Sequence, residues 1–257
     1  MEPVTTPSSA AVLPRLKLDA VGKAFGTRDA IRDISLTVYE HEFVALLGAS
    51  GSGKTTLLRC VAGLLEPDHG TVYVGGADVS ELHGRARRRV AVIFQQFNLV
   101  GRISALANVL AGRLGHVPAW HGITRSFDRS DRLLALECLD RVGLLNHAAQ
   151  RADTLSGGQQ QRVAIARALA QRPDIIVADE PVASLDPANG AAILDLLRGI
   201  CREEGVSVLC SLHQVHLARQ FADRLVGLAH GRVVLNELAA NFSDAQSHKL
   251  YENIISI

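Results

Sequence analysis

Phe43-Val-Ala-Leu-Leu47 leads directly into Gly48-Ala-Ser-Gly-Ser-Gly-Lys-Thr55, and the architecture of the chain follows from this junction. Five consecutive apolar residues are typical of a strand that is buried on both faces. Residues 54–64 then repeat apolar side chains at helical spacing. A glycine-rich loop between a buried strand and a helix predicts an α/β fold with a phosphate-binding loop.

The loop has the pattern Gly48-x-x-x-x-Gly53-Lys54-Thr55. Its glycines let the backbone wrap closely around phosphates, and the helix start adds the positive end of its dipole. Lys54 supplies a mobile charge for the β and γ phosphates, and the Thr55 hydroxyl is placed for Mg²⁺. The flanking strand and helix disfavour a chance glycine-rich turn. The predicted nucleotide-binding residues here are Gly48, Ala49, Ser50, Gly51, Ser52, Gly53, Lys54, Thr55 and Thr56.

A second apolar strand, Ile175-Ile-Val-Ala178, ends in the carboxylates Asp179 and Glu180. An Asp at the end of a buried strand beside a phosphate loop is how such NTPases hold Mg²⁺ through water. We therefore predict that Asp179 is a metal-site residue. On its own, the pair would be better explained as acidic side chains at a strand end that face solvent.

The apolar periodicity divides the chain into three parts. Strands are predicted at 15–19, 34–38 and 90–94, and again at 175–178, 206–209, 224–228 and 231–235. Between them, residues of about 98–170 have helical spacing, with apolar side chains at Leu133, Leu136, Leu139, Val142 and Leu145. We predict a flexible tail at 1–14, one domain at 15–240 whose helical subdomain covers about 98–170, and an extension at 241–257.

The composition narrows the class of protein. A net charge of +1 over 257 residues gives no reason to expect a nucleic-acid partner, and the run of arginines 85, 87, 88 and 89 is interpreted as a solvated turn. The four cysteines have neither zinc nor disulfide spacing, which fits a reducing compartment (Cys60, Cys138, Cys201, Cys210). No apolar run reaches the roughly 18–20 residues of a membrane span, and Met1–Pro14 does not have the pattern of a secretion signal.

Leu155-Ser-Gly-Gly-Gln159, continued by Gln-Gln-Arg-Val-Ala-Ile-Ala-Arg-Ala-Leu169, gives the phosphate loop a more specific meaning. Together, the two motifs resemble those of the ATP-binding cassette (ABC) family. The resemblance covers about residues 15–236 and implies that the nucleotide is ATP with Mg²⁺. It also implies the fold: an α/β P-loop NTPase cassette with a mixed RecA-like core, an antiparallel β subdomain and a helical subdomain.

The resemblance assigns roles in hydrolysis to residues that match the family's motifs. Glu180 is similar to the catalytic glutamate, which orients and deprotonates the attacking water. His213, in Ser-Leu-His-Gln, is similar to the switch histidine that contacts the γ-phosphate, and with Lys54 these residues form the predicted catalytic set. Gln95 resembles the Q-loop glutamine, a ligand of Mg²⁺ and the link to the helical subdomain, although the neighbouring Gln96 is a possible substitute.

Other residues resemble those that hold ATP between two subunits. Phe25 matches the aromatic residue that stacks on adenine, with a core aromatic as the alternative. Asp186 resembles the D-loop aspartate along the dimer interface. Ser156, Gly157, Gly158 and Gln159 form a helix start that would serve only as an N-cap in isolation. In the family this signature contacts the γ-phosphate held by a second subunit, which implies a two-fold homodimer.

The cargo is inferred from resemblance alone. Residues 94–104, 108–110 and 114–120, together with 211–219, look like the ATPase subunit of bacterial phosphonate importers. This implies permease subunits in the membrane, an external solute-binding protein, and a peripheral position on the cytoplasmic face of the membrane. Trp120 and Phe127 are either anchors for the permease or caps on the core of the helical subdomain.

Of three alternative functions, the first stays open and the other two are disfavoured. The chain could serve another ABC transporter, for amino acids, phosphate or lipoproteins. A soluble ABC ATPase of DNA repair or translation usually carries long insertions, and this chain has none. A P-loop kinase or GTPase would leave the signature segment unexplained, and no Asn-Lys-x-Asp segment for guanine is present.

Overall fold

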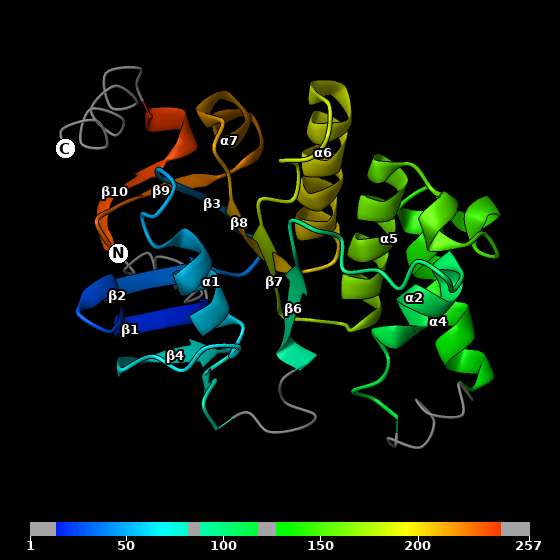
Figure 1. Cartoon of the computed structure of the whole chain (residues 1–257), viewed down its shortest axis with the longest axis horizontal. Coiled ribbons are helices and arrows are strands. Elements are labelled where there is room, and N and C mark those ends of the chain that lie inside the picture. Colours follow the sequence, from blue (N-terminus) through cyan, green and yellow to red (C-terminus); the bar gives the residue numbers. More distant parts are fainter. Residues whose placement is uncertain (1–13, 82–87, 118–126, 243–257) are drawn as a thin grey trace, which may run out of the picture.

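The computed structural model describes residues 14–81, 88–117 and 127–242. Its centre is a six-stranded sheet of order β10-β9-β3-β8-β7-β6 (Figure 1). All neighbours in this sheet are parallel except β10, which pairs antiparallel with β9 at the edge. The strands are β3 (Phe43–Leu47), β6 (Val90–Ile93), β7 (Ile175–Asp179), β8 (Ser207–Ser211), β9 (Arg224–Ala229) and β10 (Arg232–Leu238).

A second sheet is antiparallel and has the order β2-β1-β4-β5. Its strands are β1 (Pro14–Phe25), β2 (Arg28–Tyr39), β4 (His69–Val74) and β5 (Ala77–Asp78). The predicted strands 15–19 and 34–38 were too short, and β4 and β5 were not predicted. Register shifts between Leu18 and Val21 and around Lys23 interrupt the alternation that the sequence prediction relied on.

Strand β3 separates two hydrophobic cores, because its side chains alternate between the faces of the sheet. Phe43, Ala45 and Leu47 belong to the core on the side of α5, α6 and α7. Val44 and Leu46 belong to the core shared with α1 and the antiparallel sheet. All five residues are fully buried. The predicted mixed core with an antiparallel β subdomain is therefore confirmed.

The helices lie on both sides of the central sheet and at one end of it. Between β6 and β7 in the chain, α2, α4 and α5 gather beside the sheet, at the right of Figure 1. The described helices are α1 (Lys54–Val61), α2 (Ala105–Ala111), α4 (Arg129–Arg141), α5 (Gly157–Ala170), α6 (Pro187–Glu203) and α7 (Val215–Phe221), with short 3₁₀ turns at Leu145–His147, Ala152–Thr154 and Ala239–Asn241. Among the described helices, none is both long and apolar enough to cross a membrane.

The helical face predicted from Leu133 to Leu145 was wrong at both ends. Leu133 is 49% exposed, and Leu145, which lies beyond α4 in the 3₁₀ turn Leu145–His147, is 43% exposed, whereas Ala135, Cys138 and Leu139 are buried. Three-residue steps fall short of the 3.6-residue turn, so a face drawn through them drifts around the helix.

A buried ion pair joins the three helices at this end of the molecule. Arg113 Nε donates to Asp131 Oδ1 at 2.8 Å, and Arg113 Nη1 donates to the carbonyl of Ala170 at 2.9 Å. The side chains of the pair are 11% and 7% exposed. Arg113 follows α2, Asp131 lies in α4 and Ala170 ends α5, so this contact fixes the three helices relative to one another.

Several predictions fall outside the described residues. They are the tail residues 1–13, the extension residues 243–257, Arg85 and Arg87 of the basic run, and Trp120. Phe127 is described, and it packs against the core that contains α4 and α5. That contact favours a core role for Phe127 over a role as a docking anchor.

Candidate functional site

The loop between β3 and α1 has a backbone that requires glycine at two positions. Gly48 has a φ of 151°, and a Cβ there would lie 2.4 Å from the carbonyl oxygen of Leu228. Gly53 has a φ of 106°, and a Cβ there would lie 2.5 Å from the carbonyl oxygen of Ala30. The predicted glycines are thus needed for both the conformation and the close packing of this loop.

Helix α1 begins without a side-chain cap. Gly53 occupies the N-cap position and offers no side chain, whereas α2, α4, α5 and α6 all receive a cap from a side-chain oxygen. The first N–H groups of α1 therefore face the loop without a side-chain acceptor, next to the positive end of the helix dipole. Ser52 Oγ is buried and has no hydrogen-bond partner among the described residues. This arrangement fits a phosphate group.

Lys54 lies in the floor of the loop and is 5% exposed. Its Nζ donates to the carbonyls of Gly48 and Ala49 at 2.7 and 2.9 Å. Burial lowers the pKa of Lys54, while the negative charges of Glu180 and Asp179 oppose that shift. Among the described residues, the ammonium group bonds to these two neutral acceptors only, so it is available to a stronger, charged acceptor such as a phosphate.

The end of β7 places two carboxylates opposite the loop. Asp179 Oδ1 accepts a hydrogen bond from Thr55 Oγ1 at 3.3 Å and another from Ser211 Oγ at 2.9 Å. Ser211 Oγ in turn accepts from the backbone N–H of Glu180 at 2.8 Å. Ser211 had no assigned role in the sequence analysis, because a serine at a strand end carries no signal until β7 and β8 are paired.

Glu180 adopts a left-handed backbone conformation with a φ of 49°. This conformation is uncommon for a residue with a side chain, and such strain concentrates at functional sites. His213 Nε2 lies 2.5 Å from Glu180 Oε1. The structure thus brings Lys54, Thr55, Asp179, Glu180 and His213 together from three different segments of the chain.

A cavity of about 400 Å³ lies over the loop. Phe25 reaches it from β1 with 55% of its surface exposed, which rules out the alternative of a core aromatic. Arg28 and Ala30 line the cavity but were not predicted, because nothing in their local sequence marks them. The lining residues are Phe25, Arg28, Ala30, Ser50, Gly51, Gly53, Lys54, Thr55, Thr56 and Glu180.

The signature segment lies outside this cavity, at the start of α5. Ser156 Oγ accepts from the N–H of Gln159 at 3.3 Å, and Gln159 Oε1 accepts from the N–H of Ser156 at 2.9 Å. This reciprocal pair is a capping box. Gln159 Nε2 also lies 3.3 Å from His147 Nε2. A Cβ added to Gly158 would lie 3.4 Å from Asn189 Oδ1, so the signature abuts the start of α6.

Two other predicted residues also lie away from the loop cavity. Gln95 and Gln96 line a separate cavity of about 750 Å³, together with Phe97, Asp153 and Gln160. Asp186 caps α6 by accepting from Asn189 N at 3.0 Å and from Asn189 Nδ2 at 2.6 Å. These bonds from Asn189 hold the pKa of Asp186 below its usual range. Within one chain, Gln95, Asp186 and the signature do not line the cavity over the phosphate loop, although β6, which precedes Gln95, ends beside β7 (Ile93 pairs with Ala178).

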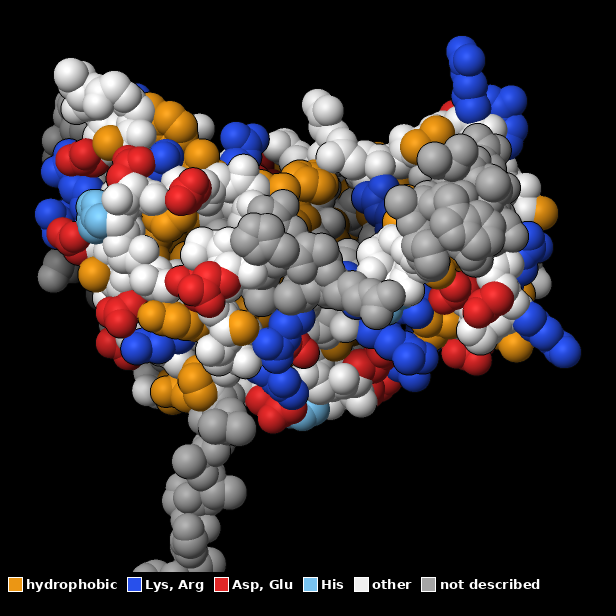
Figure 2. All heavy atoms as spheres, turned by 90° about the horizontal axis from the view of Figure 1, so that it is seen from below, with side chains coloured by type: hydrophobic (Ala, Val, Ile, Leu, Met, Phe, Trp, Pro, Cys, Tyr) orange, Lys and Arg blue, Asp and Glu red, His pale blue; other side chains and the backbone are white. Residues whose placement is uncertain are grey.

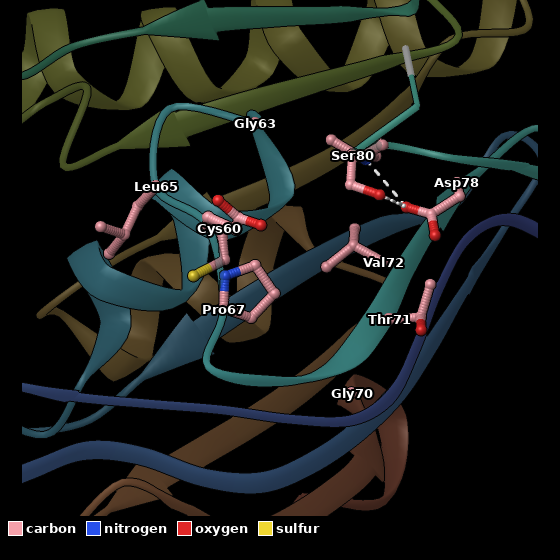
Figure 3. A pocket seen from close by; sticks show the side chains of 11 residues that line it. Cys60, Gly63, Leu65, Pro67, Gly70, Thr71, Val72, Asp78 and Ser80 are labelled. Carbon is pink, nitrogen blue, oxygen red and sulfur yellow. Dashed lines mark hydrogen bonds between the residues drawn. The ribbon is translucent and has the colours of Figure 1, made fainter.

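Another cavity, of about 360 Å³, lies between the end of α1 and β4 (Figure 3). Its lining includes the carboxylates Glu66 and Asp78, and Asp78 accepts bonds from the N–H and hydroxyl of Ser80. None of the described residues that line it is Lys or Arg. This cavity therefore does not suit a nucleotide.

The prediction that the basic run is a solvated turn was wrong for Arg89, which forms an ion pair. Arg89 Nε donates to Asp174 Oδ2 at 2.6 Å and so joins the segments before β6 and β7. Figure 2 shows basic and acidic side chains interspersed over the described part of the face that it draws. The described part of that face presents no broad basic surface for a polyanion.

Comparison with known proteins identifies the family. The sequence model described as "ABC transporter" matches residues 31–183. The chain belongs to the ABC transporter family. Among its curated relatives within this family, the phosphonates import ATP-binding protein PhnC of Rhodopseudomonas palustris strain BisB5 is 48% identical over 241 residues, which cover 92% of this chain and 89% of the relative. The hypophosphite import ATP-binding protein HtxD of Stutzerimonas stutzeri is also 48% identical, over 92% of this chain and 71% of the relative.

Solved ABC cassettes have the same fold. A dimeric cassette in a post-hydrolysis state, bound to ADP and Pi, superposes with a TM-score of 0.75 at 36% identity and covers 88% of this chain and 100% of its own. The ADP conformation of another ABC cassette gives a TM-score of 0.84 at 24% identity, with 95% and 100% coverage. The predicted cassette fold is confirmed by these matches.

The residues of this ABC protein fit Mg²⁺ and ATP. Thr55 and Asp179 offer oxygen ligands, which Mg²⁺ prefers, and the loop offers N–H groups and Lys54 to phosphates. Among the described residues, no group of three or more His, Cys, Asp or Glu side chains is arranged so that it could hold a metal ion by itself. Mg²⁺ is usually held by one or two protein ligands together with nucleotide phosphates, and Thr55 with Asp179 matches that requirement.

Proposed function

We propose that the chain is the ATPase subunit of an ABC importer for phosphonates or a related phosphorus oxyanion such as hypophosphite. The observation that carries the ATPase is the uncapped start of α1, with Lys54, opposite Asp179 and Glu180. The identity of 48% with both PhnC and HtxD, over 92% of the chain, supports the cargo class.

Each residue of the loop cavity has a distinct task in this proposal. Bound Mg²⁺–ATP supplies the γ-phosphoryl group and the metal charge that neutralises its oxygens. Lys54 exchanges its two backbone acceptors for the β and γ phosphates. Thr55 and Asp179 hold the metal, the latter through water. Glu180 orients the attacking water and accepts its proton, and His213 keeps the Glu180 carboxylate aligned by hydrogen bonding to it.

The second half of the site comes from a second copy of the chain. The start of α5 and the start of α6 lie together, and neither lines the cavity of its own loop. A two-fold dimer would bring Ser156 and Gly158 of one copy to the phosphates held by the other. Ser156 Oγ accepts its bond from Gln159, so the hydroxyl hydrogen is still available to a phosphate oxygen. When the two copies close on ATP, Gln95 and Asp186 would complete the shared nucleotide site.

The proposed complex contains two such chains, membrane-embedded permease subunits and an external solute-binding protein. The ATPase lies at the cytoplasmic face of the membrane through its contact with the permease. ATP binding closes the dimer and hydrolysis reopens it, which moves the permease between two states.

Uptake in the host tests the cargo. A strain with Lys54→Ala should fail to grow on a phosphonate or on hypophosphite as the sole phosphorus source, while growth on phosphate is normal. Accumulation of labelled methylphosphonate and hypophosphite identifies which of the two is carried. Full growth and uptake of both in the Lys54→Ala strain would refute the cargo and favour an amino-acid, phosphate or lipoprotein system, with the ATPase assignment intact.

A further inference from the structure

Arg28 lies at the mouth of the loop cavity in a position that no sequence motif assigns. It begins β2 and is the antiparallel partner of Phe25 across the hairpin that joins β1 to β2. Both side chains line the same cavity as Lys54 and Thr55. Arg28 therefore lies between the exposed aromatic ring and the phosphate loop.

The guanidinium of Arg28 reaches the loop itself. Its Nη2 lies 3.6 Å from the position that a Cβ on Gly51 would take. Gly51 has a φ of 80° and leaves the space above it open to this side chain. The charged end of Arg28 is thus directed at the part of the loop that faces the cavity.

Arg28 has no acidic partner among the described residues, although the next residue in the sequence is Asp29. Asp29 pairs instead with Arg32, with 3.1 Å between Oδ2 and Nε. Strand pairing of Arg28 uses its backbone, so the fold does not require the guanidinium. An unpaired arginine beside an uncapped helix start adds positive charge where an anion would bind.

We propose that Arg28 is a further nucleotide-binding residue, which donates hydrogen bonds to the α- or β-phosphate of ATP. This inference rests on the proposed ATPase function and names a contact on the same site. Guanidinium geometry matches phosphate oxygens, and charge-assisted bonds of this type are stronger than neutral ones. The position on the Phe25 side of the loop favours the phosphates nearest the base, which ATP and ADP share.

The test compares Arg28→Ala and Arg28→Lys with a matched control, Arg32→Ala. The control removes the same charge from the same strand, but its guanidinium is held by Asp29 and does not line the cavity. Calorimetry should show that Arg28→Ala binds both ATP and ADP about tenfold more weakly. Arg28→Lys should recover part of the affinity, and Arg32→Ala should bind like the parent.

Two further measurements separate binding from folding. The loss in Arg28→Ala should appear in KM for ATP rather than in kcat, because the contact is made equally in the ground and transition states. The unfolding midpoint without nucleotide should match that of the parent, while the rise caused by saturating ATP should shrink.

The outcomes distinguish this inference from the proposed function. Parental affinity of Arg28→Ala, or an equal loss in Arg32→Ala, would overturn the role of Arg28 and leave the ATPase intact. A parent chain that binds neither ATP nor ADP would overturn both.

Discussion

His213 Nε2 lies 2.5 Å from Glu180 Oε1, although the two residues follow different strands. Their strands, β7 and β8, pair in parallel from Ile175 with Ser207 to Asp179 with Ser211, so residues just beyond these ends meet. The contact places an imidazole on the carboxylate that we expect to activate water. Sheet register, rather than sequence proximity, therefore assembles the reactive edge of the site.

Glu180→Gln should leave ATP binding intact and lower turnover by about 10²–10⁴-fold, because an amide does not accept the proton of the attacking water. An ATP-bound dimer should accumulate, which size-exclusion chromatography with and without ATP can detect. Glu66→Gln is the control, since Glu66 lines the other cavity. Turnover at the parental rate in Glu180→Gln would remove Glu180 from the role of base.

Ser156→Arg should block hydrolysis while each chain still binds ATP. The substitution puts a bulky cation at the start of α5, where the partner's phosphates would dock, and leaves the loop cavity of the same chain unchanged. Calorimetry and a phosphate-release assay measure the two effects. Ser104→Arg is a useful comparison because Ser104 caps α2, whose start carries no signature. If Ser156→Arg hydrolyses ATP as the parent does, the site is not shared between two copies.

His147 should position the signature glutamine. Gln159 Oε1 already accepts from Ser156, so Gln159 Nε2 is the donor and His147 Nε2 the acceptor. His147→Leu should reduce kcat by about two- to tenfold, the effect of one hydrogen bond. His147→Gln supplies an amide oxygen near the position of Nε2 and should restore the rate. Equal rates in both variants would show that the acceptor does not matter.

The buried pair of Arg113 and Asp131 should dominate the stability of the helices at this end of the molecule. Asp131→Ala leaves a buried guanidinium without its carboxylate, and the free energy of unfolding should fall by about 3–5 kcal/mol. Arg151→Ala removes the exposed pair with Asp153 and should hardly move the urea midpoint. Similar midpoints for the two variants would contradict the importance of burial.

The four cysteines should be unreactive in the folded protein. All four are buried, and burial raises the pKa of Cys60 and Cys138 to about 11 and of Cys201 to about 12, with that of Cys210 raised as well. A thiol reagent at pH 8 should label the chain only after denaturation. If the native protein is labelled as fast as the denatured protein, the buried cysteines must become exposed in the folded state.

The same thiols should make stability depend on alkaline pH. Folded pKa values above the unfolded value of 9.0 mean that the unfolded chain loses protons first. The stabilisation is therefore complete below about pH 9 and is lost as the pH rises from there toward 11–12. Urea midpoints at pH 8 and pH 10 measure this, with Cys201→Ser as the variant that should flatten the slope.

Local sequence was enough to predict the features that depend on neighbouring residues. The apolar run of β3, the glycine-rich loop and the start of α1 are consecutive, so their chemistry is visible in order. Ser156 and Gln159 also lie three residues apart and form the capping box that this spacing permits.

Features that depend on pairing between distant segments were not predictable in this way. Ser211 acquires a role only because β8 lies beside β7, and Arg28 only because the hairpin turns it toward the loop. The extra length of β1 escaped notice because bulges broke its alternation. Steps of three residues placed Leu133 on a face of α4 that it does not share with the buried residues, and extended that face to Leu145, which lies beyond the helix.

The alternation of β3 has a consequence for engineering this protein. Consecutive residues of the strand pack in different cores. Ala45 lies in the core that contains helices α5–α7, and Val44 lies in the core that contains α1 and the antiparallel sheet. Enlarging Ala45 would crowd one layer, and trimming Val44 would open a void in the other. The packing of the two layers that cover the central sheet can thus be altered separately, through adjacent positions on a single strand.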